Sequence, residues 1–272
     1  MSIFNNKVVI ITGGASGIGK ALGRELARQN AIVILADWNR KMLEHTASEM
    51  GKEGLKVKVR ELDVRDLEKF KALVSETVTG HGRIDYLFNN AGIGVGGEAR
   101  DYSYEDWKQV IDVNLYGVVN GVAATYPVMV KQGFGHIINT SSLAGLVPFP
   151  GEISYTTSKY AIVGLSHTLR IEGADLGVKV SVVCPGKIET PIYQTSRIIG
   201  FDKEKALAMW PKGITAEECA KVILRGVVKN KATIPVTGLT KAMWALDRIS
   251  PNLMIWLGKI YFKKMRTARI EP

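Results

Sequence analysis

Short runs of apolar residues recur along the chain, separated by stretches in which apolar residues stand three or four positions apart. The runs are typical of buried β-strands, and the spaced stretches are typical of helices that cover a sheet. The predicted strands span residues 7–11, 31–36, 55–62, 84–89, 136–140, 178–184 and 232–236. The clearest helical patterns span residues 20–29, 67–79 and 161–176. This alternation predicts right-handed βαβ units in an α/β fold with a doubly wound parallel sheet of about seven strands.

The chain shows no linker, repeat or low-complexity run that divides it. Its 272 residues, of which 46% are hydrophobic, can bury a large core. We therefore expect one domain over residues 1–236, followed by a C-terminal helical extension over residues 237–272. The least regular stretch, residues 193–211, is a candidate lid over a site.

Cysteine usage and the first apolar segment indicate the cellular compartment of the protein. Cys184 and Cys219 stand in unrelated contexts, outside any C-x-x-C pair or histidine cluster. This favours a reducing compartment and no structural metal. The first apolar segment is interrupted at Thr12-Gly13-Gly14 before it reaches the length of a signal peptide or a membrane span. We therefore expect a cytoplasmic protein without a cleaved leader.

Positive charge is concentrated at the C-terminal end. The net charge is +10, and residues 241–272 contain seven Lys and Arg against two acidic residues, which weighs against general nucleic-acid binding. The tail has the pattern of a basic amphipathic helix, with Leu253, Trp256, Leu257 and Ile260 opposite Lys259, Lys263 and Arg266. Three interpretations stay open: packing on the domain or a neighbouring subunit, shallow attachment to an anionic membrane, or a cover over an apolar substrate pocket.

A glycine-rich turn joins the first predicted strand to the following helix. Its sequence is Thr12-Gly13-Gly14-Ala15-Ser16-Gly17-Ile18-Gly19. Backbone N–H groups and the positive end of a helix dipole suit a pyrophosphate, and glycines allow its close approach. We expect a dinucleotide to bind here, through Gly13, Ser16, Gly17, Ile18 and Gly19.

The residue that ends the second predicted strand bears on which dinucleotide binds. Asp37 can accept hydrogen bonds from the adenosine ribose hydroxyls, and its charge would repel a 2′-phosphate. Arg40 lies nearby and could offset that repulsion, but no basic residue lies inside the glycine turn. The sequence therefore favours NAD over NADP.

Tyr155 and Lys159 stand four residues apart at the start of a helical pattern, so both side chains project from one face. A phenol has a pKa of about 10 and is a poor base at neutral pH unless something favours the phenolate. Lowering that pKa by about three units takes roughly 4 kcal/mol. One cation at about 4 Å supplies Coulomb energy of that order at an effective dielectric constant of about 20. We therefore expect Lys159 alone to be nearly sufficient, with an oxidised nicotinamide adding to its effect.

These features occur together with others in a familiar order. The set is Thr12-Gly13-x-x-x-Gly17-x-Gly19, Asn89-Asn90-Ala91-Gly92, Ser142, Tyr155-x-x-x-Lys159 and Pro185-Gly186. In this register the chain resembles the short-chain dehydrogenase/reductase family, in its ordinary single-domain form, over about residues 7–236. The resemblance implies a Rossmann-like fold and NAD(P)-dependent chemistry on CH–OH groups.

The resemblance also implies roles for individual residues. Tyr155 would be the general acid/base, and Lys159 would lower its pKa and hold the nicotinamide ribose. Ser142 would hydrogen-bond the substrate oxygen, with its neighbour Ser141 as the rival. Asn114 would hold a water in a proton relay beside the lysine, the alternative being an asparagine that caps or kinks a helix.

Further cofactor contacts implied by the resemblance fall at the carboxyl ends of predicted strands, where ligands bind in open α/β sheets. They are Asp63 and Val64 at the adenine, Asn90 and Gly92 on the adenosine side, and Ile188 and Thr190 at the nicotinamide carboxamide, together with Tyr155 and Lys159.

The sequence thus predicts an NAD(P)-dependent oxidoreductase that interconverts a secondary alcohol and a ketone or aldehyde. Val147, Phe149, Ile192 and Tyr193 indicate an apolar substrate, whose identity stays open. A catalytically silent NAD(P)-binding scaffold or redox sensor is the alternative, but it does not account for the four catalytic residue types together. Nucleic-acid binding finds no supporting motif. The resemblance further implies a homodimer or homotetramer.

Overall fold

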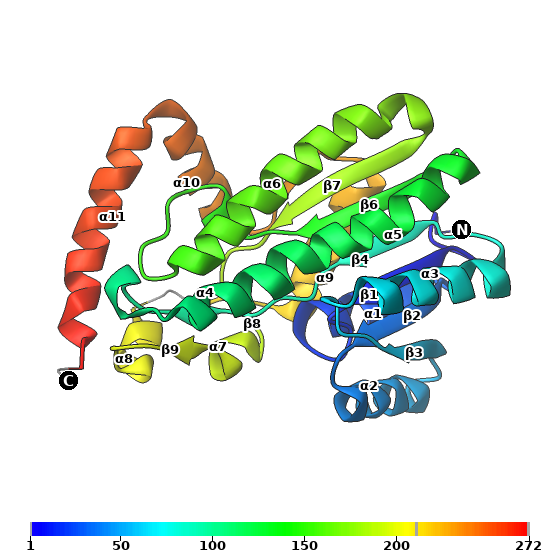
Figure 1. The fold of residues 1–272 in the computed structure, drawn as a ribbon, viewed down its shortest axis with the longest axis horizontal. Coiled ribbons are helices and arrows are strands. Elements are labelled where there is room, and N and C mark those ends of the chain that lie inside the picture. The colour runs from blue at the N-terminus through cyan, green and yellow to red at the C-terminus, as the bar shows by residue number, and fades with distance from the viewer. Residues whose placement is uncertain (1, 210–211, 271–272) are drawn as a thin grey trace.

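Seven parallel strands form the central sheet, in the spatial order β11-β7-β6-β4-β1-β2-β3 (Figure 1). A computed structural model of the chain describes residues 2–209 and 212–270. The strands are β1 (Val8–Thr12), β2 (Ile32–Asp37), β3 (Val57–Glu61), β4 (Tyr86–Asn89), β6 (Gly135–Thr140), β7 (Val178–Cys184) and β11 (Thr233–Pro235). The expected doubly wound parallel sheet is therefore confirmed.

Helices cover both faces of the sheet (Figure 1). They are α1 (Gly17–Arg28), α2 (Arg40–Lys52), α3 (Leu67–His81), α4 (Tyr104–Ile111), α5 (Gly117–Gln132), α6 (Ile153–Gly173) and α9 (Ala216–Val228). Local sequence fixes their ends. Asp66 caps the first turn of α3 by accepting from the Lys69 N–H, and Gly82 ends that helix in the left-handed conformation.

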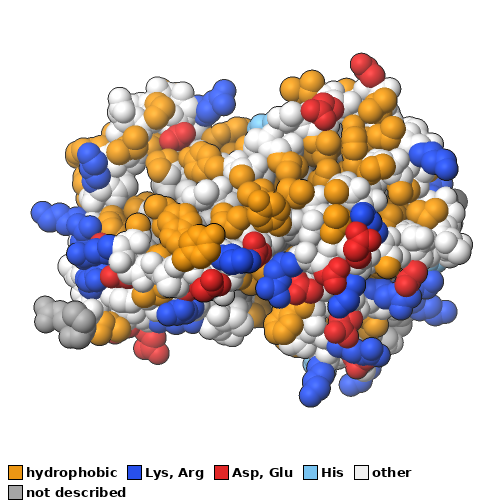
Figure 2. Space-filling model, in the orientation of Figure 1, with side chains coloured by type: hydrophobic (Ala, Val, Ile, Leu, Met, Phe, Trp, Pro, Cys, Tyr) orange, Lys and Arg blue, Asp and Glu red, His pale blue; other side chains and the backbone are white. Residues whose placement is uncertain are grey.

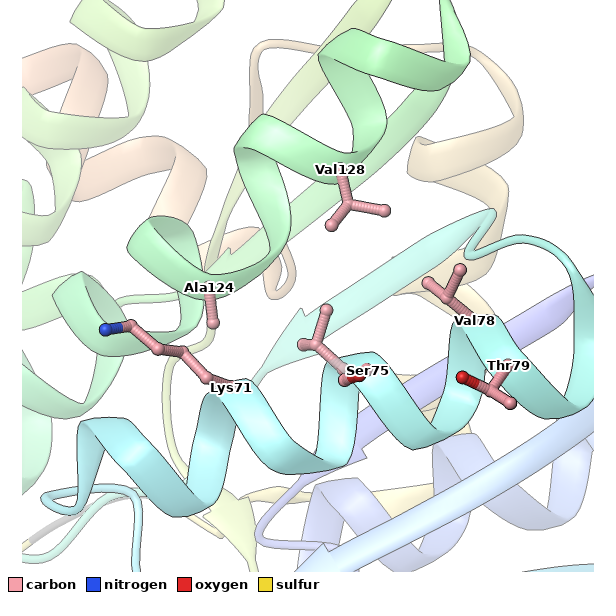
Figure 3. A pocket seen from close by; sticks show the side chains of 7 residues that line it. Lys71, Ser75, Val78, Thr79, Ala124 and Val128 are labelled. Atoms are coloured by element: carbon pink, nitrogen blue, oxygen red, sulfur yellow. The ribbon is translucent and has the colours of Figure 1, made fainter.

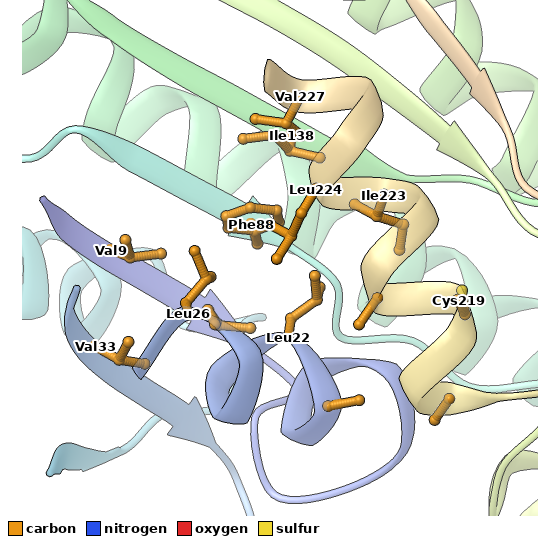
Figure 4. Packing of buried hydrophobic residues seen from close by; sticks show 14 of the residues in the cluster. Val9, Leu22, Leu26, Val33, Phe88, Ile138, Cys219, Ile223, Leu224 and Val227 are labelled. Atoms are coloured by element: carbon orange, nitrogen blue, oxygen red, sulfur yellow. The ribbon is translucent and has the colours of Figure 1, made fainter. Parts of the chain in front are cut away.

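Successive residues of the central strands point to opposite faces and feed two cores. Val9 and Ile11 of β1 pack with α1 and α9, in the cluster drawn in Figure 4. Val8 and Ile10 join the cluster on the other face, with residues of α3, α5 and α6. All four side chains are almost fully buried. Because both faces are covered, the strands carry continuous apolar runs, which is the pattern that made them predictable.

Short elements occupy the stretch that was expected to be irregular. They are α7 (Ile192–Thr195), β9 (Arg197–Ile198) and α8 (Lys203–Ala208). β9 pairs with β5 (Val95–Gly96), and β8 (Ile188–Glu189) pairs with β10 (Ile214–Thr215). Residues 210 and 211 of the candidate lid lie outside the described residues. The β5–β9 pairing ties the candidate lid segment to the loop that follows β4.

The C-terminal extension forms two helices, α10 (Gly238–Ile249) and α11 (Pro251–Met265), at the edge of the molecule (Figure 1). Trp244 of α10 and Met254 of α11 pack on the core beside α6, while Met265 joins a small cluster around Phe201. The apolar set predicted for the tail, beginning at Leu253 and Trp256, is exposed instead. The tail therefore packs on the domain, but through a different helix face. The domain boundary at residue 236 stays a prediction.

Within the described residues, one helical run is long and apolar enough to cross a membrane by length and composition, Tyr104–Gln132. It comprises α4, a π-helical turn and α5, and α5 packs against α3 and the sheet, as in the core layer of an α/β domain. Between α3 and α5 lies an open depression of about 300 Å³, lined by Lys71, Ser75 and Val128 among others (Figure 3). None of its lining residues belongs to the predicted site.

Candidate active site

The glycine turn after β1 has the geometry that a pyrophosphate requires. Gly13 and Gly17 have positive φ values, of 65° and 51°. A Cβ at Gly13 would lie 2.9 Å from the Ala91 Cα, and one at Gly19 would lie 2.1 Å from the Gly13 carbonyl oxygen. Ser16 precedes α1 without a side-chain capping hydrogen bond, which leaves first-turn N–H groups for an anion. The residues present therefore fit a dinucleotide.

Asp37 lies at the end of β2 and braces this turn. One carboxylate oxygen accepts from the Ala15 N–H at 3.1 Å, and the other accepts from the Asn39 N–H at 3.0 Å. The side chain stays half-buried, so its outer face can meet a ribose. Arg40 forms an ion pair with Glu44 at 2.8 Å and points to solvent.

The other residues expected on the adenosine side do not all lie together: one of them lies by the Lys159 ammonium instead. The Asn90 side chain donates to the carbonyl of Thr12 at 3.2 Å, and its backbone N–H donates to the Thr12 hydroxyl at 3.0 Å. Asn90 therefore braces the glycine turn. Asp63 is bound by the Arg65 guanidinium, whose hydrogen bonds lower the pKa of that carboxyl, and Val64 is buried beside it. Gly92 instead lies by the Lys159 ammonium, since an added Cβ would stand 3.6 Å from the nitrogen.

Lys159 is held at the carboxyl end of β6. Its ammonium donates to the Thr140 carbonyl at 2.9 Å, and the side chain is 3% exposed. Burial lowers the pKa of Lys159 to about 8. The nitrogen lies 5.3 Å from the centroid of the Tyr155 ring, so the helix brings the two side chains together as expected.

Ser142 and Ser141 differ in their hydrogen-bond partners. The Ser141 hydroxyl donates to the Lys159 carbonyl at 2.8 Å and is buried against the helix. Ser142 begins a 3-10 turn (Leu143–Gly145), and its hydrogen bond with Tyr155 favours the phenolate. The geometry therefore selects Ser142 over its neighbour as the group beside the phenol.

The expectation that Lys159 alone nearly activates Tyr155 is not supported. Burial raises the pKa of the phenol above its usual value, and the charge of Glu152 raises it further, against the lowering effect of Ser142. The Coulomb estimate omitted the cost of placing a phenolate in a poorly solvated site. The ammonium is also engaged by the Thr140 carbonyl. Burial and the Glu152 charge therefore disfavour the phenolate in the protein alone.

Asn114 lies in the π-helical turn Asp112–Tyr116 between α4 and α5 and is fully buried. Its side-chain oxygen accepts from the Ile93 N–H at 2.8 Å, and its nitrogen donates to the Ile93 carbonyl at 3.0 Å and the Ser158 hydroxyl at 3.2 Å. It thus occupies an irregular helical turn and also fixes the loop beside Lys159. Such turns are frequent at functional sites.

The two ends of the predicted cofactor site meet at the glycine turn. A Cβ on Gly17 would lie 3.2 Å from the Thr190 side chain, so the segment after β8 covers the start of α1. Ile188 is buried in β8.

No group of three or more metal-binding side chains is found in residues 2–209 and 212–270.

Two ion pairs that the sequence did not predict join the tail to the loop after β5. Arg266 donates to both oxygens of Glu98, at 3.0 and 3.3 Å, and Arg269 donates to both oxygens of Asp101, at 2.8 and 2.9 Å. These bonds hold the pKa of both carboxyls below the usual value, although Glu98 is buried. The partners stand 168 positions apart, so sequence spacing gives no signal for them.

Glu152, at the N-terminal end of α6, is a residue that the sequence did not single out. It lies one turn before Tyr155, and its side chain forms no ion pair or hydrogen bond within the part of the chain described. Burial raises the pKa of its carboxyl to about 7. After burial itself, its charge is the next cause of the raised pKa of Tyr155 and of Tyr193. An uncompensated acid therefore stands beside the phenol.

Known proteins are similar to this chain in sequence and in fold. The chain matches the family described as short chain dehydrogenase over residues 7–198. The putative oxidoreductase SadH of Mycobacterium tuberculosis is 36% identical over 255 residues, which cover 92% of each chain. Cyclohexanol dehydrogenase of an Acinetobacter species is 34% identical, over 81% of this chain and 87% of that one. A crystal structure of a short-chain dehydrogenase/reductase from Burkholderia phymatum in complex with NAD gives a TM-score of 0.81 at 28% identity, covering 93% and 96% of the two chains.

The fold, the glycine turn and these matches define a nucleotide-binding oxidoreductase. The chain belongs to the short-chain dehydrogenase/reductase family, and the resemblance found in its sequence motifs is confirmed. Members of the family bind NAD(P), which agrees with the fit of the turn to a pyrophosphate.

The ion pairs of the tail yield a first prediction. In the double variant Arg266→Gln/Arg269→Gln, the loop around Glu98 loses its anchor. We expect KM for substrate to rise about tenfold, with kcat within about threefold, because a displaced loop weakens substrate positioning more than chemistry. Arg248→Gln, an exposed tail variant without an ion pair, is the control. Equal KM values in both variants would contradict a link between the tail and the substrate site.

Glu152 yields a prediction about pH. Its negative charge raises the pKa of Tyr155, so Glu152→Gln lowers that pKa. We expect the limb of the kcat/KM profile that reports phenol deprotonation during alcohol oxidation to move to lower pH. Glu204→Gln, an exposed acid on α8, should leave the profile in place. A limb that stays fixed in Glu152→Gln would show that this carboxyl does not act on the phenol.

Proposed function

We propose that the protein is an NAD-dependent dehydrogenase/reductase that interconverts a secondary alcohol and a ketone or aldehyde, on an apolar substrate. The observation that carries this proposal is the buried Lys159 ammonium, fixed at the end of β6 beside a phenol that is itself bonded to Ser142. The cyclohexanol dehydrogenase relative acts on a secondary alcohol by its name and supports the reaction class.

Each residue would have its own role in the reaction. Tyr155 takes the hydroxyl proton of the alcohol on its phenol oxygen, or returns it in the reverse direction. Ser142 donates a hydrogen bond to the same substrate oxygen as negative charge develops there. Lys159 stabilises the phenolate and holds the nicotinamide ribose, and Asn114 keeps a water beside it. When bound, the nicotinamide accepts the hydride from the carbinol carbon or returns it.

The cofactor would be held along the strand ends. Gly13, Ser16, Gly17, Ile18 and Gly19 would hold the pyrophosphate. Asp37 would bind the ribose hydroxyls, while Ile188 and Thr190 would contact the carboxamide. The ion pair of Arg40 with Glu44 supports NAD, because the Arg40 guanidinium is then already paired and does not neutralise a 2′-phosphate.

Replacing the proposed acid/base tests the reaction. We expect Tyr155→Phe to lower kcat by at least about a hundredfold while NAD binding is retained, because the proton loses its carrier. The matched control is Tyr160→Phe, which changes an exposed tyrosine on the same helix. Turnover is measured on a panel of secondary alcohols and ketones through the absorbance of the reduced cofactor. Full turnover in Tyr155→Phe would overturn the mechanism, and a wild-type protein that binds NAD but turns over no substrate would favour a silent scaffold.

Asp37 yields a prediction about the cofactor. In Asp37→Asn the side chain keeps an acceptor for the glycine turn but loses the charge that repels a 2′-phosphate. We expect the ratio of kcat/KM for NAD to that for NADP to fall at least about tenfold. Thermal unfolding of the variant shows whether the turn is intact. A wild-type preference for NADP would refute the assignment.

Oligomerisation would use the face formed by α4, α5 and α6. Figure 2 shows apolar side chains gathered over this face, and Tyr104, Ile153 and Tyr160 on these helices are exposed. Members of the family are commonly oligomeric, and an apolar face of this kind supports a homodimer or homotetramer. Sedimentation equilibrium of the purified protein should give a multiple of the 29.8 kDa chain mass. A monomer at micromolar concentration would contradict it.

A further inference from the structure

Helix α11 presents two apolar faces, and only one of them is covered. Met254 and Met265 are buried against the domain. On the opposite side of the helix, four apolar side chains lie on one stripe at three- and four-residue spacing. We call them the outer strip: Leu253, Trp256, Leu257 and Ile260. Trp256 is 55% exposed and Ile260 is 50% exposed. A large exposed apolar stripe of this kind marks a site of contact with another apolar surface.

Uncompensated positive charge surrounds the outer strip. Lys259, Lys263 and Lys264 lie on α11, which contains no acidic residue, and none of the three forms an ion pair within residues 2–209 and 212–270. Lys and Arg side chains gather along this edge in Figure 2. Arg266 and Arg269 differ, because both are occupied by Glu98 and Asp101. The strip therefore faces outward amid free cations.

This combination fits a lipid surface better than a second copy of the chain. A second copy would bring the same positive helix against this one, and the α4–α6 face already offers an apolar surface for self-association. Anionic headgroups match free lysines, while Trp and aliphatic side chains enter the boundary between headgroups and acyl chains. We propose that the outer strip of α11 and its flanking lysines dock the protein on anionic phospholipid membranes.

Docking in this way would place the substrate site at the lipid surface. On the inner face of α11, the Tyr261 ring lies 6.5 Å from the Phe149 ring, and Met265 lies against Gly151, a few residues before Tyr155. The helix therefore separates the site from the membrane by one layer of side chains. An apolar alcohol or ketone dissolved in the bilayer would enter beside it, a consequence that rests on the proposed function.

Vesicle co-sedimentation of the full-length protein tests the docking without any need for activity. At low salt, the protein should bind phosphatidylcholine vesicles that contain about 30 mol% phosphatidylserine at least about tenfold more strongly than vesicles of phosphatidylcholine alone. The bound fraction should fall as salt is raised. Protein that stays in the supernatant with both vesicles at low salt overturns the proposal.

Two sets of variants assign the binding to α11. Trp256→Glu/Ile260→Glu and Lys259→Gln/Lys263→Gln/Lys264→Gln should each weaken binding at least about tenfold. The matched controls are Val228→Glu, at an exposed valine of α9, and Lys41→Gln/Lys52→Gln/Lys56→Gln, at exposed lysines on and after α2. Controls should bind as the wild type does. Unchanged binding in the α11 variants, or a dimer that Trp256→Glu/Ile260→Glu dissolves in sedimentation velocity, overturns the proposal. The latter result would assign the strip to self-association.

Discussion

The hydrogen bond from the Lys159 ammonium to the Thr140 carbonyl holds the site together. A buried ammonium is costly unless its donors are satisfied, and the last carbonyl of β6 satisfies one of them. The bond fixes the first turns of α6 against the strand end. Tyr155 and Ser142 are therefore placed at the same edge of the sheet as the glycine turn after β1. The proposed chemistry would depend on this anchoring, since the proposed reacting groups come from different segments of the chain.

In the protein alone, the surroundings of Tyr155 raise the pKa of its phenol. Burial and the Glu152 carboxyl oppose ionisation of Tyr155, while Ser142 favours it. An oxidised nicotinamide, with its positive ring, would favour the phenolate if it bound beside Tyr155 as proposed. The base would then form only when the cofactor is present in the form that accepts hydride.

The sequence predicted what depends on local pattern and missed what depends on tertiary contact. All seven sheet strands were placed within two residues. The central strands are buried on both faces and carry continuous apolar runs, whereas the edge strand β3 alternates apolar and polar residues. Tyr155 and Lys159 were singled out by helical spacing together with the accompanying motifs of the family that the chain resembles. The Glu98–Arg266 pair has no spacing signal, and β9, with two residues, is too short for periodicity. The sequence left the position of α11 open, because an amphipathic pattern does not show which of two apolar stripes meets the domain.

The most direct measurement is a spectroscopic titration of tyrosinate absorbance, taken as the difference between wild type and Tyr155→Phe. It is performed on the protein alone, with oxidised cofactor and with reduced cofactor. The account predicts that the pKa of Tyr155 lies above that of a free phenol in the protein alone, and falls clearly when the oxidised form binds but not when the reduced form binds. The same pKa in all three states would contradict it.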